Sequence, residues 1–104
     1  MLDKRERYSL LLDYYGDLLT GHQVDVLTEY LNEDFSMSEI AEHNKVSKSA
    51  VQDLIKRTIR QLDDYEKCLK LIEKDSKLDI ILDEMKNENN PVFDKYINKI
   101  IKIR

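Results

Sequence analysis

The sequence is poor in the residues that interrupt regular secondary structure and in the residue that forms disulfides. Its 104 residues include two glycines, one proline and one cysteine. So few turn-forming residues argue against a β-sandwich with its many tight turns. A single cysteine excludes an internal disulfide and fits a reducing compartment. The charged N-terminus lacks the apolar segment of a signal peptide, and no apolar run reaches the length of a membrane span. We therefore expect a cytoplasmic protein without membrane insertion.

What the sequence has is a helical pattern. Hydrophobic residues make up 41% of the chain and charged residues 37%, which suits helices with one apolar stripe and one charged face. Apolar residues recur every three or four positions and predict an all-α protein. The stripes lie in residues 5–19, 24–31, 37–41, 51–72, 78–85 and 93–101. Gly16 is expected inside the first helix, where it costs some helicity without breaking the pattern.

Helix starts are marked by residues whose side chains can accept a bond from a free backbone N–H. The predicted caps are Thr20 with Gln23, Ser36 with Glu39, Ser47, Ser76 with Asp79, and Asn90 before Pro91. The helix that follows Ser47 either runs long or bends near Asp64. The turn before it is expected at residues 43–46.

The stretch "SMSEIAEHNKVSKSAVQDLIKR", residues 36–57, has the pattern of a helix-turn-helix. Two helices that cross steeply need a small residue where they touch, and Ala41 is in that place. Ile40, Val46 and Val51 would wedge the crossing, together with Leu54 or Ile55. We expect one all-helical domain over 1–104, with a helix-turn-helix core at about 20–62 and a C-terminal helical extension at about 66–103. A plain helical corner with a solvated charged face is the alternative.

Charge is unevenly distributed along this acidic chain of 17 basic and 21 acidic residues. Residues 36–61 form its net-positive segment, with five basic residues against three acidic ones, whereas residues 1–35 hold three against eight. Such weak local positivity is poor evidence for tight non-specific binding to a duplex, but it places any anion contact in this segment.

The second helix of this pattern supplies the candidate nucleic-acid-binding residues. Side chains that donate and accept hydrogen bonds can read base edges, whereas more distant cations hold phosphates. The residues expected to face bases are Ser47, Lys48, Ser49, Gln52 and Lys56, and those expected to face phosphates are Lys45, Arg57 and Arg60.

Residues 19–57 resemble the domain of bacterial sigma factors that reads the −35 promoter element, through Leu-Thr, then Gln, then Ser-x-x-Glu-Ile-Ala, Ser-x-x-Ala-Val and a Lys-Arg pair. The flanks "RYSLLLDYYGDLLT" and "RQLDDYEKCLKL" are similar to the YlxM family of low-GC Gram-positive bacteria, often encoded beside the signal recognition particle GTPase. The resemblance spans residues 7–72 well and the rest loosely. It implies a sigma-like helix-turn-helix protein, of the winged-helix-like superfamily without a wing, tied to the signal recognition particle pathway.

Two residues depart from the family pattern at the end of the first helix of the pair. An apolar residue followed by Gly or Asn is usual there, and this chain has Asn44 and Lys45. Either Asn44 takes the left-handed conformation and shifts the turn by one residue, or Lys45 takes it with modest strain.

Enzyme chemistry is not visible in the sequence. His22 and His43 lack metal-ligand spacing, Cys68 has acidic neighbours that disfavour a thiolate, and no glycine-rich loop could hold a phosphate. We expect no catalytic residue, metal or cofactor. Four tyrosines could stack on unpaired RNA bases, although their helical spacing favours the core; they are Tyr14, Tyr15, Tyr30 and Tyr65.

Two functions stay open at this point. The first is a regulator that binds nucleic acid, with DNA favoured and RNA as the alternative. The second is a protein-interaction module in which the helix-turn-helix is a scaffold and another face binds the signal recognition particle GTPase or its RNA. The C-terminal stripes, in residues 78–85 and 93–101, either fold back on the long helix or bury against a second copy in a homodimer.

Overall fold

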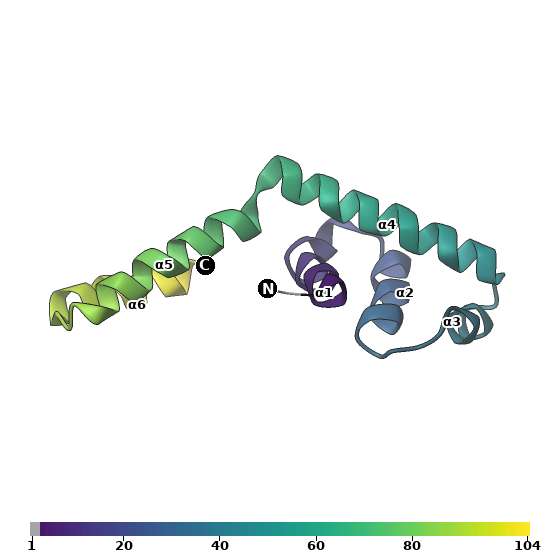
Figure 1. Ribbon diagram of the computed structural model, residues 1–104, viewed down its shortest axis with the longest axis horizontal. Helices are drawn as coiled ribbons and strands as arrows, with labels where there is room; N and C mark the ends of the chain where they lie inside the picture. The colour runs from purple at the N-terminus through teal and green to yellow at the C-terminus, as the bar shows by residue number, and fades with distance from the viewer. Residues whose placement is uncertain (1–2) are drawn as a thin grey trace. The chain divides into compact units, whose positions relative to one another are not determined.

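A computed structural model describes residues 3–104. Within that range the chain forms six α-helices and one short 3₁₀ turn, and it has no strand (Figure 1). The elements are α1 (Lys4–Tyr15), the 3₁₀ turn η1 (Gly16–Leu18), α2 (Gly21–Leu31), α3 (Met37–Asn44), α4 (Lys48–Leu69), α5 (Leu71–Asn87) and α6 (Pro91–Ile103). The all-α prediction, with helices before and after the helix-turn-helix pair, is confirmed.

The helices belong to two compact units, one ending at Lys70 and the other formed by Leu71–Arg104. We call them the N-terminal unit and the C-terminal hairpin, and each is described by itself. The expectation of one domain over 1–104 stays a prediction.

Four of the predicted caps are present. The capping boxes at α2 and α3 are complete: in α2 the Thr20 hydroxyl accepts from the backbone N–H of Gln23 at 3.2 Å, and the Gln23 side chain accepts from that of Thr20 at 3.0 Å. Asn90 accepts from the N–H of Val92 at 2.9 Å, directly before Pro91. The cap predicted at Ser76 is wrong, because α5 already begins at Leu71 and Ser76 lies inside it.

The first helix is shorter than predicted. It ends at Tyr15, and Gly16–Leu18 form a 3₁₀ turn in which the N–H of Leu19 donates to the Gly16 carbonyl at 3.0 Å. Gly16 itself keeps right-handed helical dihedrals, φ −55° and ψ −34°, and its N–H still donates to the Leu12 carbonyl, so it is the residue at which the α-helix ends. The next helix is capped at Thr20, so the chain has to turn within a few residues, and glycine tolerates the end of a helix better than its middle.

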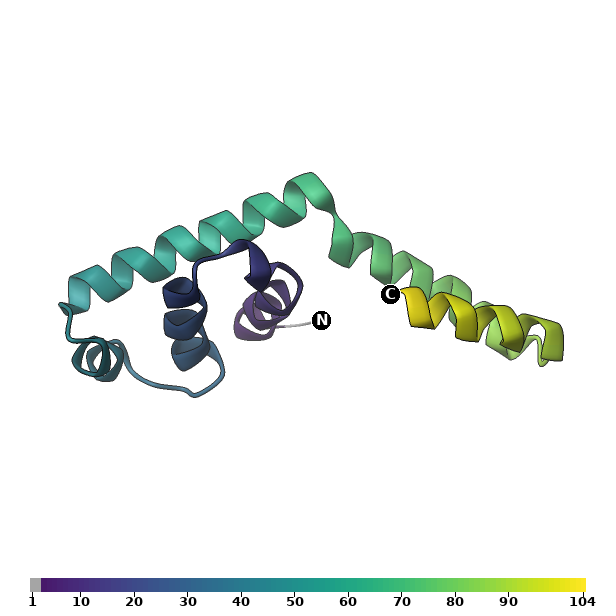
Figure 2. The same cartoon turned by 180° about the vertical axis from the view of Figure 1, so that it is seen from behind.

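The core of the N-terminal unit lies under α4, which packs against α1, α2 and α3 (Figures 1 and 2). Helix α4 is continuous to Leu69, so of the two predicted alternatives it is the long helix and not the one that bends near Asp64. Lys70, in the left-handed conformation with φ 56°, ends it. The buried apolar residues of this unit are Leu11, Leu12, Tyr15, Val26, Leu27, Leu31, Ile40, Ala41, Val51, Ile55 and Leu62.

The C-terminal hairpin consists of α5 and α6 lying side by side in opposite directions (Figure 2). Its two most buried apolar side chains are Leu82 and Ile97, and an ion pair at 2.6 Å joins the Asp79 carboxylate to Arg104. Asn89 turns the chain with φ 52°. The predicted stripes thus pack against each other, but several large apolar side chains of the hairpin are exposed: Leu71, Ile80, Ile81, Val92, Tyr96, Ile101 and Ile103.

Candidate nucleic-acid interface

The turn between α3 and α4 comprises residues 45–47. Lys45 has φ 57° and ψ 43°, its N–H donates to the Glu42 carbonyl at 3.3 Å, and the Val46 N–H donates to the Ala41 carbonyl at 3.0 Å. These paired bonds around a left-handed residue end α3 in a Schellman motif. Lys45 rather than Asn44 therefore takes the left-handed conformation, and the turn starts two residues later than predicted because residues 43 and 44 stay helical.

The last turn of α3 is fixed by its contacts with a buried carboxylate. The Asn44 side-chain amide donates to the Ile40 carbonyl at 2.8 Å and to Glu29 Oε2 at 3.3 Å, and His43 Nδ1 lies 2.9 Å from Glu29 Oε1. Glu29 is buried in α2, while the ring of His43 remains largely exposed as predicted. Sequence reasoning missed Glu29, because a carboxylate beside an apolar stripe is normally solvated.

The crossing of α3 and α4 follows the predicted pattern with one exception. Ile40, Ala41, Val51 and Ile55 are buried where the two helices meet. Val46, however, is 43% exposed, so its predicted role as a wedge is wrong.

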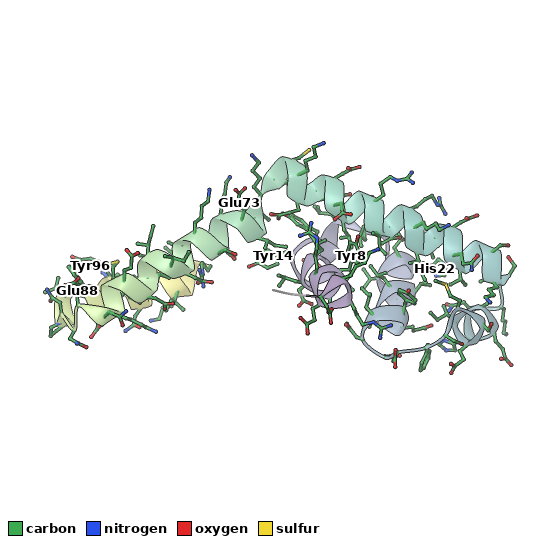
Figure 3. The ribbon with its side chains drawn as sticks, viewed as in Figure 1. Tyr8, Tyr14, His22, Glu73, Glu88 and Tyr96 are labelled. Carbon is green, nitrogen blue, oxygen red and sulfur yellow. The ribbon has the colours of Figure 1, made fainter. Side chains whose placement is uncertain are left out.

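Val46 instead lines an apolar hollow between the start of α2, the turn and α4. Figure 3 labels His22, which lies at this edge of α2. The hollow is lined by His22, Val26, Val46, Ala50, Val51, Leu54 and Arg57. An apolar surface therefore lies next to the basic residues of α4.

Ser47 starts α4 by accepting a hydrogen bond from the Ala50 N–H at 3.1 Å. Its Oγ also lies 3.3 Å from Ser49 Oγ. Part of the hydrogen-bonding capacity of Ser47 is therefore already used within the protein. The sequence pattern predicted this cap, but a hydroxyl that caps a helix is less available to contact a base.

All eight predicted site residues are exposed. Lys45 and Ser47 lie in the turn, and the remaining six lie on α4. At about 100° per residue, Ser49, Lys56 and Arg60 fall on one side of the helix together with Asp53. We call these four residues the exposed strip. The strip lies opposite the buried side chains of α4, Val51, Ile55, Thr58 and Leu62, and its flanks carry Lys48, Gln52 and Arg57.

The cations of this region lack carboxylate partners among residues 3–104. Residues 45–60 hold five basic side chains and a single acidic one, Asp53, and none of the five is in a salt bridge within the described chain. Other basic residues of the same unit are paired: Arg5 lies 2.6 Å from Asp34, and this hydrogen bond raises the pKa of the Arg5 guanidinium. The charge of α4 is thus available to an outside anion.

A polar network holds α4 against α2. The Gln23 side-chain amide donates to Thr58 Oγ1 at 3.2 Å and to Gln61 Oε1 at 3.0 Å, and the Gln61 amide donates to the Tyr65 hydroxyl at 3.0 Å. Thr58 in turn donates to the Leu54 carbonyl at 2.7 Å. These bonds satisfy the buried Thr58 hydroxyl and fix the rotation of α4, which keeps the exposed strip facing outward.

The tyrosines differ in their surroundings. Tyr15 is buried, its hydroxyl donates to Glu66 Oε1 at 2.5 Å, and its ring centroid lies 5.9 Å from that of Tyr65. Tyr14, Tyr30 and Tyr65 are half-buried. The core interpretation therefore holds for Tyr15, whereas Tyr30 keeps part of its ring at the surface.

Two further observations concern the described residues only. Among residues 3–104, no three His, Cys, Asp or Glu side chains are grouped so that they could hold a metal ion. Over the same range, no helix has both the length and the apolarity that crossing a membrane requires.

Comparison with known proteins places this architecture in a family. The model of the family described as "Putative helix-turn-helix protein, YlxM / p13 like" matches residues 2–103. The chain belongs to the UPF0122 family. A UPF0122 protein of Clostridium perfringens is 46% identical over 102 residues, which cover 96% of this chain and 91% of that protein. A UPF0122 protein of Clostridium kluyveri is 42% identical over 108 residues, with coverages of 96% and 97%.

A more distant UPF0122 protein, from Exiguobacterium sibiricum, is 41% identical over 90 residues, covering 86% of this chain and 85% of the relative. The YlxM resemblance of the sequence is thereby confirmed. The family description also agrees with the α3–turn–α4 unit.

Proposed function

We propose that this UPF0122 protein is a non-enzymatic helix-turn-helix protein that binds duplex DNA through the start of α4. The observation that carries the proposal is a recognition helix whose five cations, in the turn and on α4, are exposed and have no carboxylate partner in the described chain. A helix of this kind fits the major groove, and unpaired cations release counterions when they meet phosphates.

The residues divide by their place on α4. Lys48, Ser49 and Gln52 lie in the first two turns, where a recognition helix contacts base edges, and Lys56 follows on the same side. Arg57 and Arg60 lie one turn farther along, and Lys45 lies in the turn, so these three are assigned to phosphates. Ser47 contributes mainly as the cap that fixes the start of the helix.

Charge reversal on α4 tests this function. In Arg57→Glu a cation becomes an anion at an exposed position, so affinity for a duplex should fall and its salt dependence should flatten. Binding is measured by fluorescence anisotropy with mixed-sequence DNA at low salt, and the same titration is repeated with double-stranded RNA. If the wild-type protein does not bind the DNA duplex at low salt, the proposal is wrong, and binding of the RNA duplex alone would favour the RNA alternative.

A finer proposal concerns the cellular role. The YlxM resemblance supports a regulatory protein of the cytoplasm that acts in the signal recognition particle pathway, with the particle's RNA as the alternative nucleic acid. Crosslinking in cells, followed by identification of both nucleic-acid and protein partners, tests it. Recovery of DNA alone, without any component of the particle, would contradict a role in that pathway.

A second candidate function is a protein-interaction module that binds the signal recognition particle GTPase or a second copy of the chain. It is favoured by the net acidic charge and by the large apolar side chains exposed on the C-terminal hairpin, since such residues often mark an interface. Truncation after Lys70 should abolish capture of the partner, while charge reversal at Lys48 and Arg57 should not. Sedimentation of a monomer at high micromolar concentration would exclude the homodimer.

A further inference from the structure

The basic residues of the first 35 positions are gathered at one place. This segment holds three of them against eight acidic residues, and all three lie in the first turn and a half of α1: Lys4, Arg5 and Arg7. Helix α1 packs against α4, so a segment that is acidic in sequence brings positive charge to the middle of α4.

Two hollows between these helices adjoin each other and share Lys4, Tyr8 and Ile59. The first is lined by Lys4, Arg5, Tyr8, Tyr30, Leu31 and Ile59, and the second by Lys4, Tyr8, Lys56, Ile59, Arg60 and Asp63. Figure 3 labels Tyr8, which lies on α1 toward α4. We call these two neighbouring hollows together the α1–α4 pocket. It reaches the exposed strip, because Lys56 and Arg60 belong to both.

The side chains of this pocket are of two kinds. Tyr8 and Tyr30 are half-buried aromatic rings, and the Arg5 guanidinium lies 5.8 Å from the Tyr30 ring centroid while Asp34 holds it at 2.6 Å. Aromatic rings and arginine planes are the surfaces on which unpaired bases stack. Lys4, Lys56 and Arg60 surround these surfaces with positive charge.

One carboxylate, Asp63, lies at the rim of the pocket. It is 3.3 Å from Arg7, which offsets its charge. Lys4, Lys56 and Arg60 have no salt-bridge partner within residues 3–104. The balance of the pocket is therefore positive, which favours a ligand that carries a phosphate together with a flat apolar group.

We propose that the α1–α4 pocket binds one unpaired nucleotide next to the duplex held by α4. The inference rests on the proposed function and adds to it a preference for a duplex with a single-stranded extension or bulge. The base stacks against the tyrosines and Arg5, and its phosphate contacts Lys4 and Arg60. Bases inside a duplex hide their faces from protein, so a pocket of this composition selects a base outside the stack. Single-stranded DNA and RNA offer the same chemistry.

The test compares a blunt duplex with the same duplex carrying a short single-stranded extension, made once in DNA and once in RNA. A 2-aminopurine base in the extension reports stacking through its fluorescence, and the chain contains no tryptophan to interfere. We expect the extension to tighten binding by about 5- to 150-fold, the range that stacking of one base supplies. The gain should be lost in Tyr8→Leu, whose affinity for the blunt duplex stays unchanged.

A second variant covers the case in which Tyr8→Leu does not fold. Lys4→Glu changes an exposed residue in the first turn of α1, where an acidic side chain suits the helix dipole. It should also lose the gain from the extension. Lys74→Glu, in the first turn of α5, makes the same charge change outside the N-terminal unit and should keep the gain, as should Tyr96→Leu on α6.

The outcomes separate the two claims. A blunt duplex that binds without any gain from either extension, or a gain that survives both pocket variants, would overturn the pocket and leave the proposed function intact. A gain with one sugar type assigns the source to DNA or to RNA and supports the pocket. If the blunt duplex does not bind, the proposed function fails. The 2-aminopurine single strand alone then tests the pocket. A fluorescence change that is lost in Tyr8→Leu supports it, and a change that persists in Tyr8→Leu overturns it.

Discussion

Replacing Lys48 by Gln should reduce the salt dependence of duplex binding by a calculable amount. Lys48 is exposed at the first position of α4 and has no salt bridge within the described chain. A lysine that reads base edges in the groove also brings its charge among the phosphates, so with all five cations of residues 45–60 displacing counterions the slope of log affinity against log salt is about −4.5. Raising salt from about 50 to about 200 mM then weakens binding roughly 500-fold. With four cations the slope is about −3.6 and the loss roughly 150-fold.

Fluorescence anisotropy at four or five salt concentrations measures these slopes directly. Lys48→Gln should not unfold the protein, because removing a cation from a helix N-terminus is favourable for the helix dipole. Lys74→Gln makes the same change at the start of α5, and its slope should equal that of the wild type.

Two results would refute the reasoning. An unchanged slope in Lys48→Gln would remove Lys48 from the interface. A wild-type slope near zero would show that α4 is not the nucleic-acid-binding surface, and the protein-interaction function would then be favoured.

Three further predictions concern stability, measured by urea unfolding. Lys45→Gly should raise the free energy of unfolding by about 1 kcal/mol, because it relieves a left-handed non-glycine residue; a loss of stability would contradict the strain. Gln23→Leu should cost about 1–3 kcal/mol, since it removes a capping side chain and the amide that donates to Thr58 Oγ1 and Gln61 Oε1; a neutral effect would make the network dispensable. Ser47→Ala should cost about 0.5–2 kcal/mol, whereas Ser76→Ala, inside α5, should cost nothing measurable.

The helix starts were predictable because a capping hydrogen bond joins residues that are close in the sequence. Thr20, Ser36, Ser47 and Asn90 each contact a backbone group two or three residues away, so the sequence pattern contains the whole interaction. Ser76 has a similar pattern and caps nothing, because α5 already begins at Leu71 and its backbone groups there are bonded within the helix. Lysine at a left-handed position has no sequence signature, since glycine and asparagine are the residues expected there.

The tertiary contacts of the site were less predictable. Glu29 is buried because His43 and Asn44, from another helix, lie beside it, and nothing within a few residues of Glu29 indicates this. The position of Lys4 was unpredictable for the same reason. Its segment is acidic in sequence, yet the fold places Lys4 beside Lys56 in one hollow. The exposure of all eight predicted site residues followed from helical period, but their roles in binding stay predictions.

The double use of Gln23 has a consequence for the order of folding. Its side-chain carbonyl caps the start of α2 by accepting from the Thr20 N–H, while its side-chain amide donates to Thr58 and Gln61, which lie 35 and 38 positions away in the chain. An isolated 11-residue helix is marginal in water, so the first turn of α2 should become stable only when α4 is in place. In a φ-value analysis, substitutions at Gln23 and at Thr58 should therefore give similar values, because both report the same docking event.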